Sequence, residues 1–439
     1  MKKTINICWF RRDLRLTDNA ALYHALKEGK PVLPIFIFDK YILDELEDKS
    51  DRRVGFIHAA IEEMQSRLTE LSTSMEVYYG FPEEVFAKLT KTYDIDTVFA
   101  NHDYEHYAID RDNTVAALLG QAGIKFKTYK DHVIFEKTEV VKDDGKSYSV
   151  FTPYSRKWKS KLNDFYLKAY PTEPLFTHFY KQKPKPICSL EEMGFAAGDG
   201  DFPSPDPDEE IIRKYGKQRD FPGINGTSKL GVHLRFGTVS IRKLARLALG
   251  LNETFLNELI WRDFYQMVLA NFPQIGQGKS FRPEYDNIRW RNNEEEFRRW
   301  CEGQTGFPIV DAGMRELNAT GFMHNRVRMI VASFLTKDLL VDWRWGEAYF
   351  AAKLLDFDFA ANNGGWQWAS GSGCDAAPYF RVFNPSRQAA TFDKGLVYIR
   401  KWVPELDSFG YPSPLVDHDI VRKRCLEVYA KGLNKNVNP

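Results

Sequence analysis

The chain has 439 residues and a net charge of +1, with 61 Lys and Arg balanced by 60 Asp and Glu, so no global field draws it to nucleic acid. Its hydrophobic content of 43% is ordinary for a soluble protein of two or three domains, while its aromatic content of 14% is high. The five cysteines are scattered and form no CxxC pair, which argues against a disulfide framework, a zinc site or an iron–sulfur cluster, and we expect no bound metal.

The N-terminal segment bears on where the protein resides. Its apolar run at residues 5–10 is short and is followed at once by RRDLR, which does not fit a signal peptide. No later stretch approaches the 18 apolar residues of a transmembrane helix. Scattered cysteines are typical of a reducing compartment. We therefore expect a cytoplasmic protein without membrane contact.

Residues 1–131 alternate between strand and helix patterns. Strands are predicted at residues 5–10, 32–38, 75–79, 97–101 and 124–129. Helices are predicted from a cap at residues 17–19 to about Gly29, and at 52–71, 83–92 and 107–120. Such alternation predicts right-handed βαβ units and an α/β domain with a doubly wound parallel sheet, Rossmann-like in form. No G-x-G-x-x-G follows any strand, so the dinucleotide fingerprint is missing.

Beyond residue 131 the alternation stops. Nine of the 21 prolines lie between residues 150 and 222, and we interpret residues 132–222 as a long interdomain linker over the surface. Residues 223–439 predict an all-α domain. Its helices are expected at 228–234, 240–249, 253–271, 293–302, 309–319, 324–340 and 344–355.

Two short segments have a functional and a structural interpretation. Residues 223–240 place Gly, Thr and Ser before a helix, which is typical of phosphate binding but also of an ordinary capped helix. Residues 257–267 place Glu258, Trp261, Arg262 and Tyr265 on one helix face. That face predicts either a binding pocket or, more commonly, an ion pair at the edge of a core.

The densest signal lies at residues 307–388. Trp343, Trp345, Trp366 and Trp368 are interspersed there with Asn, Arg and Asp side chains, and Trp402 follows. A core built only for stability favours Leu, Ile and Val. This mixture therefore predicts a pocket that holds a large planar ring system.

A basic set near the C-terminal end has two interpretations. It is interleaved with aromatic residues and consists of Arg381, Arg387, Lys394, Arg400 and Lys401. A solvated face is the more common explanation of such charges. The alternative is a track for a phosphate backbone.

Long motifs along the whole chain resemble the photolyase/cryptochrome family, and within it the bacterial class I DNA photolyases that repair cyclobutane pyrimidine dimers. The matching segments are WFRRDLRLTDN (9–19), VFTPYSRKW (150–158), TSKL (227–230), ELIWRDFY (258–265), TGFPIVDAGMRELNATGFMHNRVRM (305–329), ASFLTKDLLVDWRWGE (332–347) and ANNGGWQWASGSGCDAAPYFRVFNPSRQ (361–388). The resemblance implies an enzyme, a carbon–carbon lyase. The dimer would be flipped out of the base stack of the DNA into the active site. Excited reduced FAD would then transfer one electron to it.

The resemblance also implies which residues bind FAD in the helical domain. Residues 227–231 would hold the pyrophosphate, Arg328 and Asp356 would pair beside the flavin ring, and Asn362 would face flavin N5. The full set is Tyr215, Thr227, Ser228, Lys229, Leu230, Gly231, Arg262, Arg328, Asp356, Asp358 and Asn362. Where the family usually has Ser, this chain has Gly231, which loses a hydroxyl donor but keeps the backbone N–H.

For the substrate, the resemblance implies a pocket in which two indoles wall the fused bases and polar groups bind their edges. Its residues are Glu258, Trp261, Asn325, Met329 and Trp368. DNA contacts are implied for Arg219, Glu258, Trp261, Arg262, Asn325, Arg326, Arg381 and Gln388. An electron-transfer chain that reduces oxidised FAD is implied for Trp290, Trp343 and Trp366, whereas Trp345 matches no such position.

The second chromophore of the family is left open by the sequence. Folate-binding members carry an Asn-Glu pair where this chain has Tyr107-Ala108, and the Lys expected near residue 276 falls in IGQG. The folate pattern is therefore not matched, and a deazaflavin, another flavin or no antenna remain as alternatives.

Three alternatives to the repair of cyclobutane dimers are disfavoured by the sequence. A cryptochrome photoreceptor would bind the same FAD without repair, but such sensors typically have Asp at the position of Asn362 and a C-terminal extension. A DASH-type cryptochrome is disfavoured by Trp261, Met329 and Trp368. Repair of (6-4) photoproducts is disfavoured because Asn325 and Met329 stand where further histidines would be needed. Nothing indicates an oligomer seam, so we expect a monomer.

Overall fold

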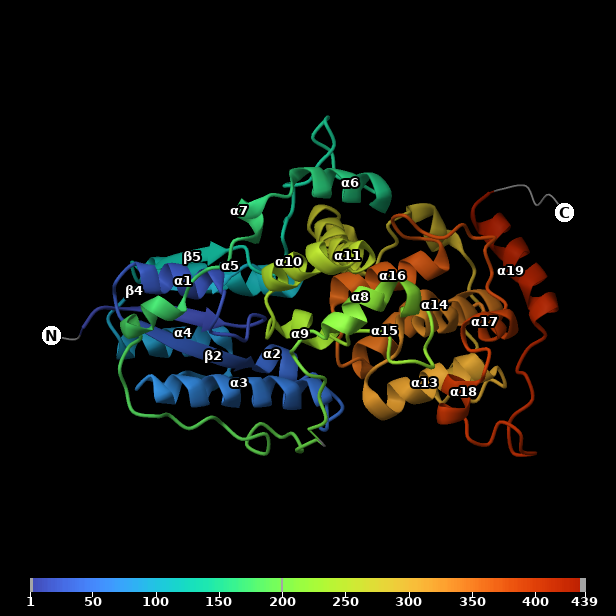
Figure 1. Ribbon diagram of the computed structural model, residues 1–439, viewed down its shortest axis with the longest axis horizontal. Coiled ribbons are helices and arrows are strands. Elements are labelled where there is room, and N and C mark those ends of the chain that lie inside the picture. The colour runs from blue at the N-terminus through green and yellow to red at the C-terminus, as the bar shows by residue number, and fades with distance from the viewer. Residues whose placement is uncertain (1–2, 199, 435–439) are drawn as a thin grey trace. The chain divides into compact units, whose positions relative to one another are not determined.

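The computed structural model describes residues 3–198 and 200–434. The chain forms two compact units, each assembled from separate stretches (Figure 1). Unit 1 contains Met1–Glu136, Leu162–Pro207 and Lys229–Leu247, and unit 2 contains Lys137–Lys161, Asp208–Ser228 and Ala248–Pro439. The functional domains predicted with boundaries at residues 131 and 222 remain a proposal.

Unit 1 is built on a five-stranded sheet in which every pair of neighbouring strands is parallel. The strands are β1 (Ile5–Phe10), β2 (Val32–Asp39), β3 (Glu76–Gly80), β4 (Ile95–Asn101) and β5 (Lys125–Tyr129), in the order β3-β2-β1-β4-β5. The predicted doubly wound α/β fold is confirmed, because the chain moves outward from β1 to β3 and then crosses back to β4.

Four main helices accompany this sheet: α1 (Ala20–Lys27), α3 (Arg52–Glu70), α4 (Pro82–Thr92) and α5 (His106–Gln121). The predicted cap of the first helix is Asn19, whose side chain accepts from the N–H of Leu22. Helices α4 and α5 pack side by side and cover one face of the sheet with apolar residues such as Phe86 and Leu119. Alternating inward residues of the strands, Ile5, Ile7 and Trp9 among them, complete this core.

The segment interpreted as an interdomain linker, residues 132–222, contains regular structure. It contains α6 (Phe151–Lys161), α7 (Asp164–Leu167), a 3-10 helix (Glu173–His178) and α8 (Glu209–Gln218). In α6, Tyr154 and Trp158 are fully buried, and the indole N–H of Trp158 donates to Asp263 at 2.9 Å. The many prolines conceal these elements because they stand mostly between them.

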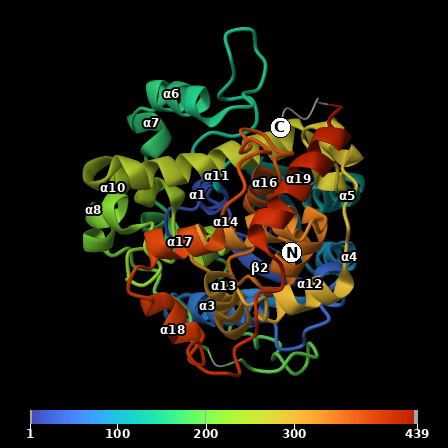
Figure 2. The ribbon, with the colours of Figure 1, turned by 90° about the vertical axis from the view of Figure 1, so that its right-hand side faces the viewer.

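Unit 2 is helical, as predicted (Figures 1 and 2). After α10 (Ile241–Leu251), its helices are α11 (Glu253–Asn271), α12 (Glu294–Cys301), α13 (Pro308–Thr320), α14 (Asn325–Ser333), α15 (Trp343–Lys353), α16 (Phe359–Ser370), α17 (Pro385–Phe392), α18 (Val397–Trp402) and α19 (His418–Gly432). The helix expected at 324–340 ends at Ser333 and continues as a π-helical turn at Phe334–Asp338. Within residues 3–198 and 200–434, no helix is both long and apolar enough to cross a bilayer.

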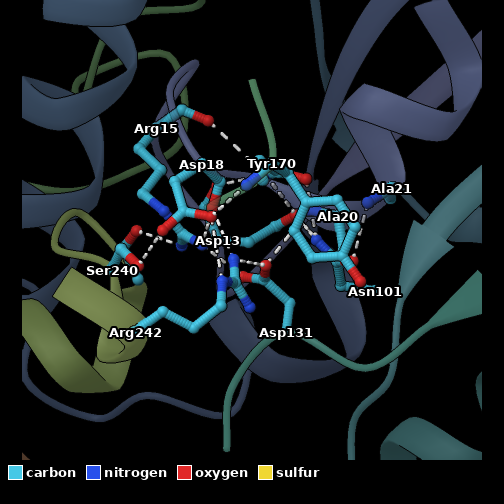
Figure 3. Close-up of polar contacts among 12 residues, drawn as sticks. Asp13, Arg15, Asp18, Ala20, Ala21, Asn101, Asp131, Tyr170, Ser240 and Arg242 are labelled. Carbon is cyan, nitrogen blue, oxygen red and sulfur yellow. Dashed lines mark hydrogen bonds and ion pairs between the residues drawn. The ribbon is translucent and has the colours of Figure 1, made fainter. Parts of the chain in front are cut away.

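A buried ion network ties distant stretches of unit 1 together (Figure 3). Arg242 donates to Asp131 at 2.8 Å and to Asp18 at 2.9 Å, and Arg15 donates to Asp131 at 2.6 Å. Ser240 also donates to Asp18, at 2.5 Å. Residues 9–19, which carry part of the sequence resemblance, thus contribute Arg15 and Asp18 to the internal structure of unit 1.

Candidate active site

Three packed helices of unit 2 carry the predicted pocket residues. Helix α16 packs against both α11 and α14 (Figures 1 and 2). The contact between α11 and α16 is close, since a Cβ at Gly364 would lie 2.3 Å from the ring of Tyr265. The absence of a side chain at Gly364 therefore allows the ring of Tyr265 to approach the backbone of α16.

On α11, Glu258 forms an ion pair with Arg219, the C-cap of α8. Both side chains are partly exposed, at 31% and 35%. Burial raises the pKa of Glu258 above its usual range, and Arg219 opposes that rise. The ion pair considered as a structural alternative for this helix face does exist, but the partner of Glu258 is Arg219.

Trp261 lies one turn further along α11 and stacks on a second aromatic ring. Its indole is 3.8 Å, centroid to centroid, from the ring of Phe151, and the two planes differ by 4°. Phe151 begins α6, and its backbone N–H donates to Asp375 at 3.2 Å. Phe151 was not predicted as a functional residue, because its segment was interpreted as a linker. Its place in the family motif VFTPYSRKW (150–158) could have identified it.

Helix α14 brings a polar and an apolar group to its first two turns. His324 caps the helix by accepting from the N–H of Arg326 at 3.1 Å, which requires a neutral ring nitrogen. Burial lowers the pKa of His324 to about 4, consistent with that state. Asn325, exposed, and Met329, half-buried, follow four residues apart and therefore share a helix face.

Arg326 is held by three neighbours. Its Nη2 donates to Asp220 at 2.7 Å, and its Nη1 lies 3.9 Å from the sulfur of Met329. The guanidinium carbon lies 4.3 Å from the centre of the Phe392 ring. Asp220 was not identified from the sequence.

The carboxylates predicted to lie beside a flavin are all engaged. Arg328 donates from Nη2 to both carboxylate oxygens of Asp356, at 3.1 Å and 2.9 Å. Asp358 caps α16 and accepts from the amide of Gln266 at 3.0 Å and 3.2 Å. The predicted pairing of Arg328 with Asp356 is therefore present.

Asn362 has a fixed orientation in α16. Its amide nitrogen donates at 3.1 Å both to the backbone carbonyl and to the carboxylate of Glu347 in α15. Burial raises the pKa of Glu347, and the hydrogen bond from Asn362 opposes that rise. Glu347 was missed by sequence reasoning, although it ends a quoted motif.

The remaining predicted FAD residues lie in different parts of the chain. Tyr215 in α8 is half-buried and packs edge-on against Phe255 at 5.2 Å, and Arg262 in α11 is half-buried. Of the predicted phosphate loop, Thr227 and Ser228 belong to unit 2, whereas Lys229, Leu230 and Gly231 belong to unit 1. Gly231 begins α9 (Gly231–Phe236), and Lys229 has a positive φ of 53°.

The three tryptophans of the predicted electron-transfer chain differ in burial. Trp366 and Trp343 are 2% and 1% exposed, and Trp290 is half-buried against the same core. A Cβ at Gly346 would lie 2.1 Å from the Trp366 ring, so the absence of a side chain there lets α15 approach Trp366. The fully buried Trp300, which sequence reasoning did not single out, meets Trp366 edge-on at 6.1 Å.

The other predicted pocket and DNA residues differ in exposure. Trp368 is half-buried against the main core of unit 2. Arg381 is exposed and lies 5.3 Å from the Phe383 ring. Gln388, in α17, is half-buried.

In unit 1, the segment that departs from the folate pattern is engaged internally. Tyr107 donates from its hydroxyl to Asp39 at 2.6 Å. Its ring also lies 5.8 Å from the guanidinium of Arg111. Tyr107 therefore satisfies a carboxylate at the end of β2, and the antenna stays an open question.

Comparisons with known proteins identify the family of the chain. Family models match residues 6–175, as DNA photolyase, and residues 255–410, as the FAD binding domain of DNA photolyase. The chain is 38% identical to a deoxyribodipyrimidine photo-lyase of Vibrio cholerae, covering 98% of this chain and 100% of that relative.

Two solved structures are also similar. A bacterial class III photolyase from Agrobacterium tumefaciens is 31% identical with a TM-score of 0.87, over 99% of both chains. An archaeal photolyase from Sulfolobus tokodaii, solved with two FAD molecules, is 34% identical with a TM-score of 0.79, over 97% of this chain and 99% of that one. The chain therefore belongs to the DNA photolyase family, and it is an enzyme of that family with an FAD-binding domain in its helical unit.

Proposed function

We propose that this protein repairs cyclobutane pyrimidine dimers in DNA with light. The proposal is supported by a relative named deoxyribodipyrimidine photo-lyase, which is 38% identical over nearly the whole chain. It is also supported by the positions of the residues assigned to the dimer pocket, which lie on α11, α14 and α16, with α16 packed against the other two helices. Bound reduced FAD would supply the electron that opens the dimer.

The observation that carries the proposal is the content of one helix, α16. Within two turns it bears Asn362 with its amide fixed, the buried Trp366 and the half-buried Trp368. These are the proposed flavin contact, one member of the electron-transfer chain and one wall of the dimer pocket. A single rigid element would thus align the three groups.

The donor set suits a reduced flavin. The side-chain nitrogen of Asn362 donates both of its hydrogen bonds to Glu347. The side-chain oxygen of Asn362 therefore remains as an acceptor. An acceptor is what the N5–H of a reduced flavin requires. The Arg328–Asp356 pair offers a cation and an anion at fixed positions, and we assign it to the ring edge. Asp358, Arg262, Tyr215 and residues 227–231 complete the proposed FAD set.

For the substrate, each pocket residue has one role. Trp261 and Trp368 provide flat surfaces for the fused bases, and Phe151 keeps the Trp261 ring in place from one side. Glu258 and Asn325 bind polar base edges, and Met329 fills the space between them. Arg219, Arg262, Arg326, Arg381 and Gln388 are the proposed DNA contacts.

The alternative is a cryptochrome-type photoreceptor that binds FAD without repairing DNA. It is disfavoured by Asn362, since the sequence reasoning expects Asp there in such sensors. The two functions separate in one experiment. Reduced protein is illuminated with blue light in the presence of oligonucleotides that carry a cyclobutane dimer, a (6-4) photoproduct or no lesion. Repair of the first alone supports the proposal, and light absorption without repair of any would refute it.

A further inference from the structure

Two neighbouring residues after α8 hold two proposed DNA-binding groups. Arg219 forms an ion pair with Glu258 of α11, and Asp220 accepts from Arg326 of α14 at 2.7 Å. The dipeptide is itself anchored, because the N–H of Arg219 donates to the carbonyl of Tyr215 at 2.9 Å. In the free protein, two cations and two anions are therefore balanced within one short segment and its two partners.

Arg326 is ordered before any DNA arrives. Its guanidinium lies against the Phe392 ring at 4.3 Å, and the side chain is only 17% exposed. Its Nε has no hydrogen-bond partner among the described residues. Asp220, at 39% exposure, is the more accessible member of the pair. A carboxylate binds the planar guanidinium fork in the same manner as a phosphate does, so the two compete for it.

We propose that Asp220 is a specificity-determining residue, which competes with DNA phosphate for Arg326 and thereby weakens the binding of undamaged DNA more than that of dimer-containing DNA. This inference rests on the proposed function. It adds a residue that the sequence reasoning did not assign and that repels the wrong substrate.

The selectivity follows from the partners that each DNA provides. Undamaged DNA offers only phosphates, so the ion pair between Glu258 and Arg219 stays intact. A phosphate that binds Arg326 then leaves the Asp220 carboxylate without its cation and next to the negatively charged phosphate. A flipped dimer instead offers base N–H groups to Glu258, which frees Arg219. The freed Arg219, adjacent in the chain, then balances Asp220 or a phosphate. Only the lesion therefore relieves the cost of breaking the Asp220–Arg326 pair.

The test measures dissociation constants in the dark by fluorescence anisotropy, with labelled oligothymidines that carry one cyclobutane dimer or none. Asp220→Asn should tighten binding of the undamaged strand about fivefold and that of the dimer strand less than about twofold. Its salt dependence on undamaged DNA should steepen by about one phosphate contact. Asp220→Glu, which keeps the carboxylate, should retain the wild-type ratio of the two constants.

The matched control is Glu209→Gln. It removes a carboxylate from α8, the helix that precedes Asp220, where Glu209 pairs with Arg213 at 3.0 Å, outside the proposed DNA contacts. The control should leave the ratio unchanged, and a change equal to that of Asp220→Asn would reduce the effect to net charge and overturn the inference. Equal tightening on both strands, or none, would also overturn it. Bound flavin absorbance reports that each variant is folded. A wild-type protein that does not prefer the dimer strand would instead count against the proposed function.

Discussion

The amide nitrogen of Asn362 donates two hydrogen bonds to Glu347, one to its backbone carbonyl and one to its carboxylate, each at 3.1 Å. The pair joins α16 to α15 and determines which atom of Asn362 remains as an acceptor. Glu347 thus positions Asn362 without itself being a proposed contact of the cofactor. Sequence reasoning found Asn362 from its motif but had no means of finding which residue orients it.

Removing this support should make the reduced state of bound FAD less stable. In Glu347→Ala, the Asn362 amide can rotate, and the loss of about one net hydrogen bond should speed reoxidation of bound FAD in air about fivefold. FAD content should stay near that of the wild type. The measurement is the recovery of oxidised-flavin absorbance in the dark. The control is Glu302→Ala, which removes an exposed carboxylate paired with Arg298. If FAD in Glu347→Ala is reoxidised no faster than in this control, Glu347 does not have the assigned role.

Trp290 should be needed to reduce FAD but not to repair DNA. It is the half-buried member of the proposed chain, and its ring meets Tyr429 edge-on at 5.9 Å. Trp290→Phe should abolish photoreduction of oxidised FAD by an external reductant, while chemically reduced protein repairs as before. The control is Trp345→Phe, because Trp345 is also partly buried on the core but lies outside the chain. Normal photoreduction in Trp290→Phe would exclude Trp290 from it.

Glu258 should act on the substrate and not on the cofactor. Glu258→Ala removes a carboxylate proposed to bind the dimer edge and should slow repair at least about tenfold. FAD should remain bound at the wild-type level, because Glu258 is not in the proposed FAD set. Single-turnover repair and the flavin-to-protein absorbance ratio test this together. Equal repair in variant and wild type would refute the role of Glu258 in substrate binding. Loss of FAD would instead assign Glu258 to the cofactor site.

The ion network of unit 1 should support stability, not chemistry. Asp131 is 1% exposed and Arg242 is 4% exposed. Arg242→Ala leaves Asp131 with Arg15 and takes from Asp18 the guanidinium at 2.9 Å, so it should lower the free energy of unfolding by about 3 kcal/mol. The neighbouring Lys243→Ala, an exposed position, should change little. Thermal unfolding followed by circular dichroism measures both. Equal melting temperatures for the two variants would show that the network contributes nothing.

The same network predicts a dependence on pH. Burial alone would raise the pKa of Asp131, but Arg15 and Arg242 outweigh it and hold that pKa well below its usual range. A depressed pKa contributes stability that is fully present above the unfolded value of about 3.9 and is lost as pH falls toward the folded value. Between pH 5 and pH 3, the free energy of unfolding should therefore fall further in the wild type than in Arg242→Ala, and the difference should be about 1 kcal/mol or more. Parallel losses in the two proteins would contradict this.

The sheet and most helices were accessible to sequence reasoning because local pattern determines them. Strands such as residues 5–10 are continuous apolar runs, and the cap at Asn19 is a local hydrogen bond. The helix expected at 324–340 failed only at its end, where a π-helical turn follows Ser333. A periodicity of 3.6 does not distinguish that turn from a continuing helix.

The contacts between distant segments were not accessible. Phe151 against Trp261 and Asp220 against Arg326 join residues more than 100 positions apart, and neither pair leaves a periodic trace. The motif resemblance identified one partner of each pair as functional. The other partner became visible only when the helices were packed.

The most direct test of the central claim is repair itself. Purified protein is chemically reduced, mixed with an oligothymidine that carries a cyclobutane dimer, illuminated with blue light, and assayed by chromatography for restored thymine. We predict restoration that depends on light and is absent in an otherwise identical dark sample. No restoration in the light, with FAD bound and reduced, would contradict the account and favour a photoreceptor.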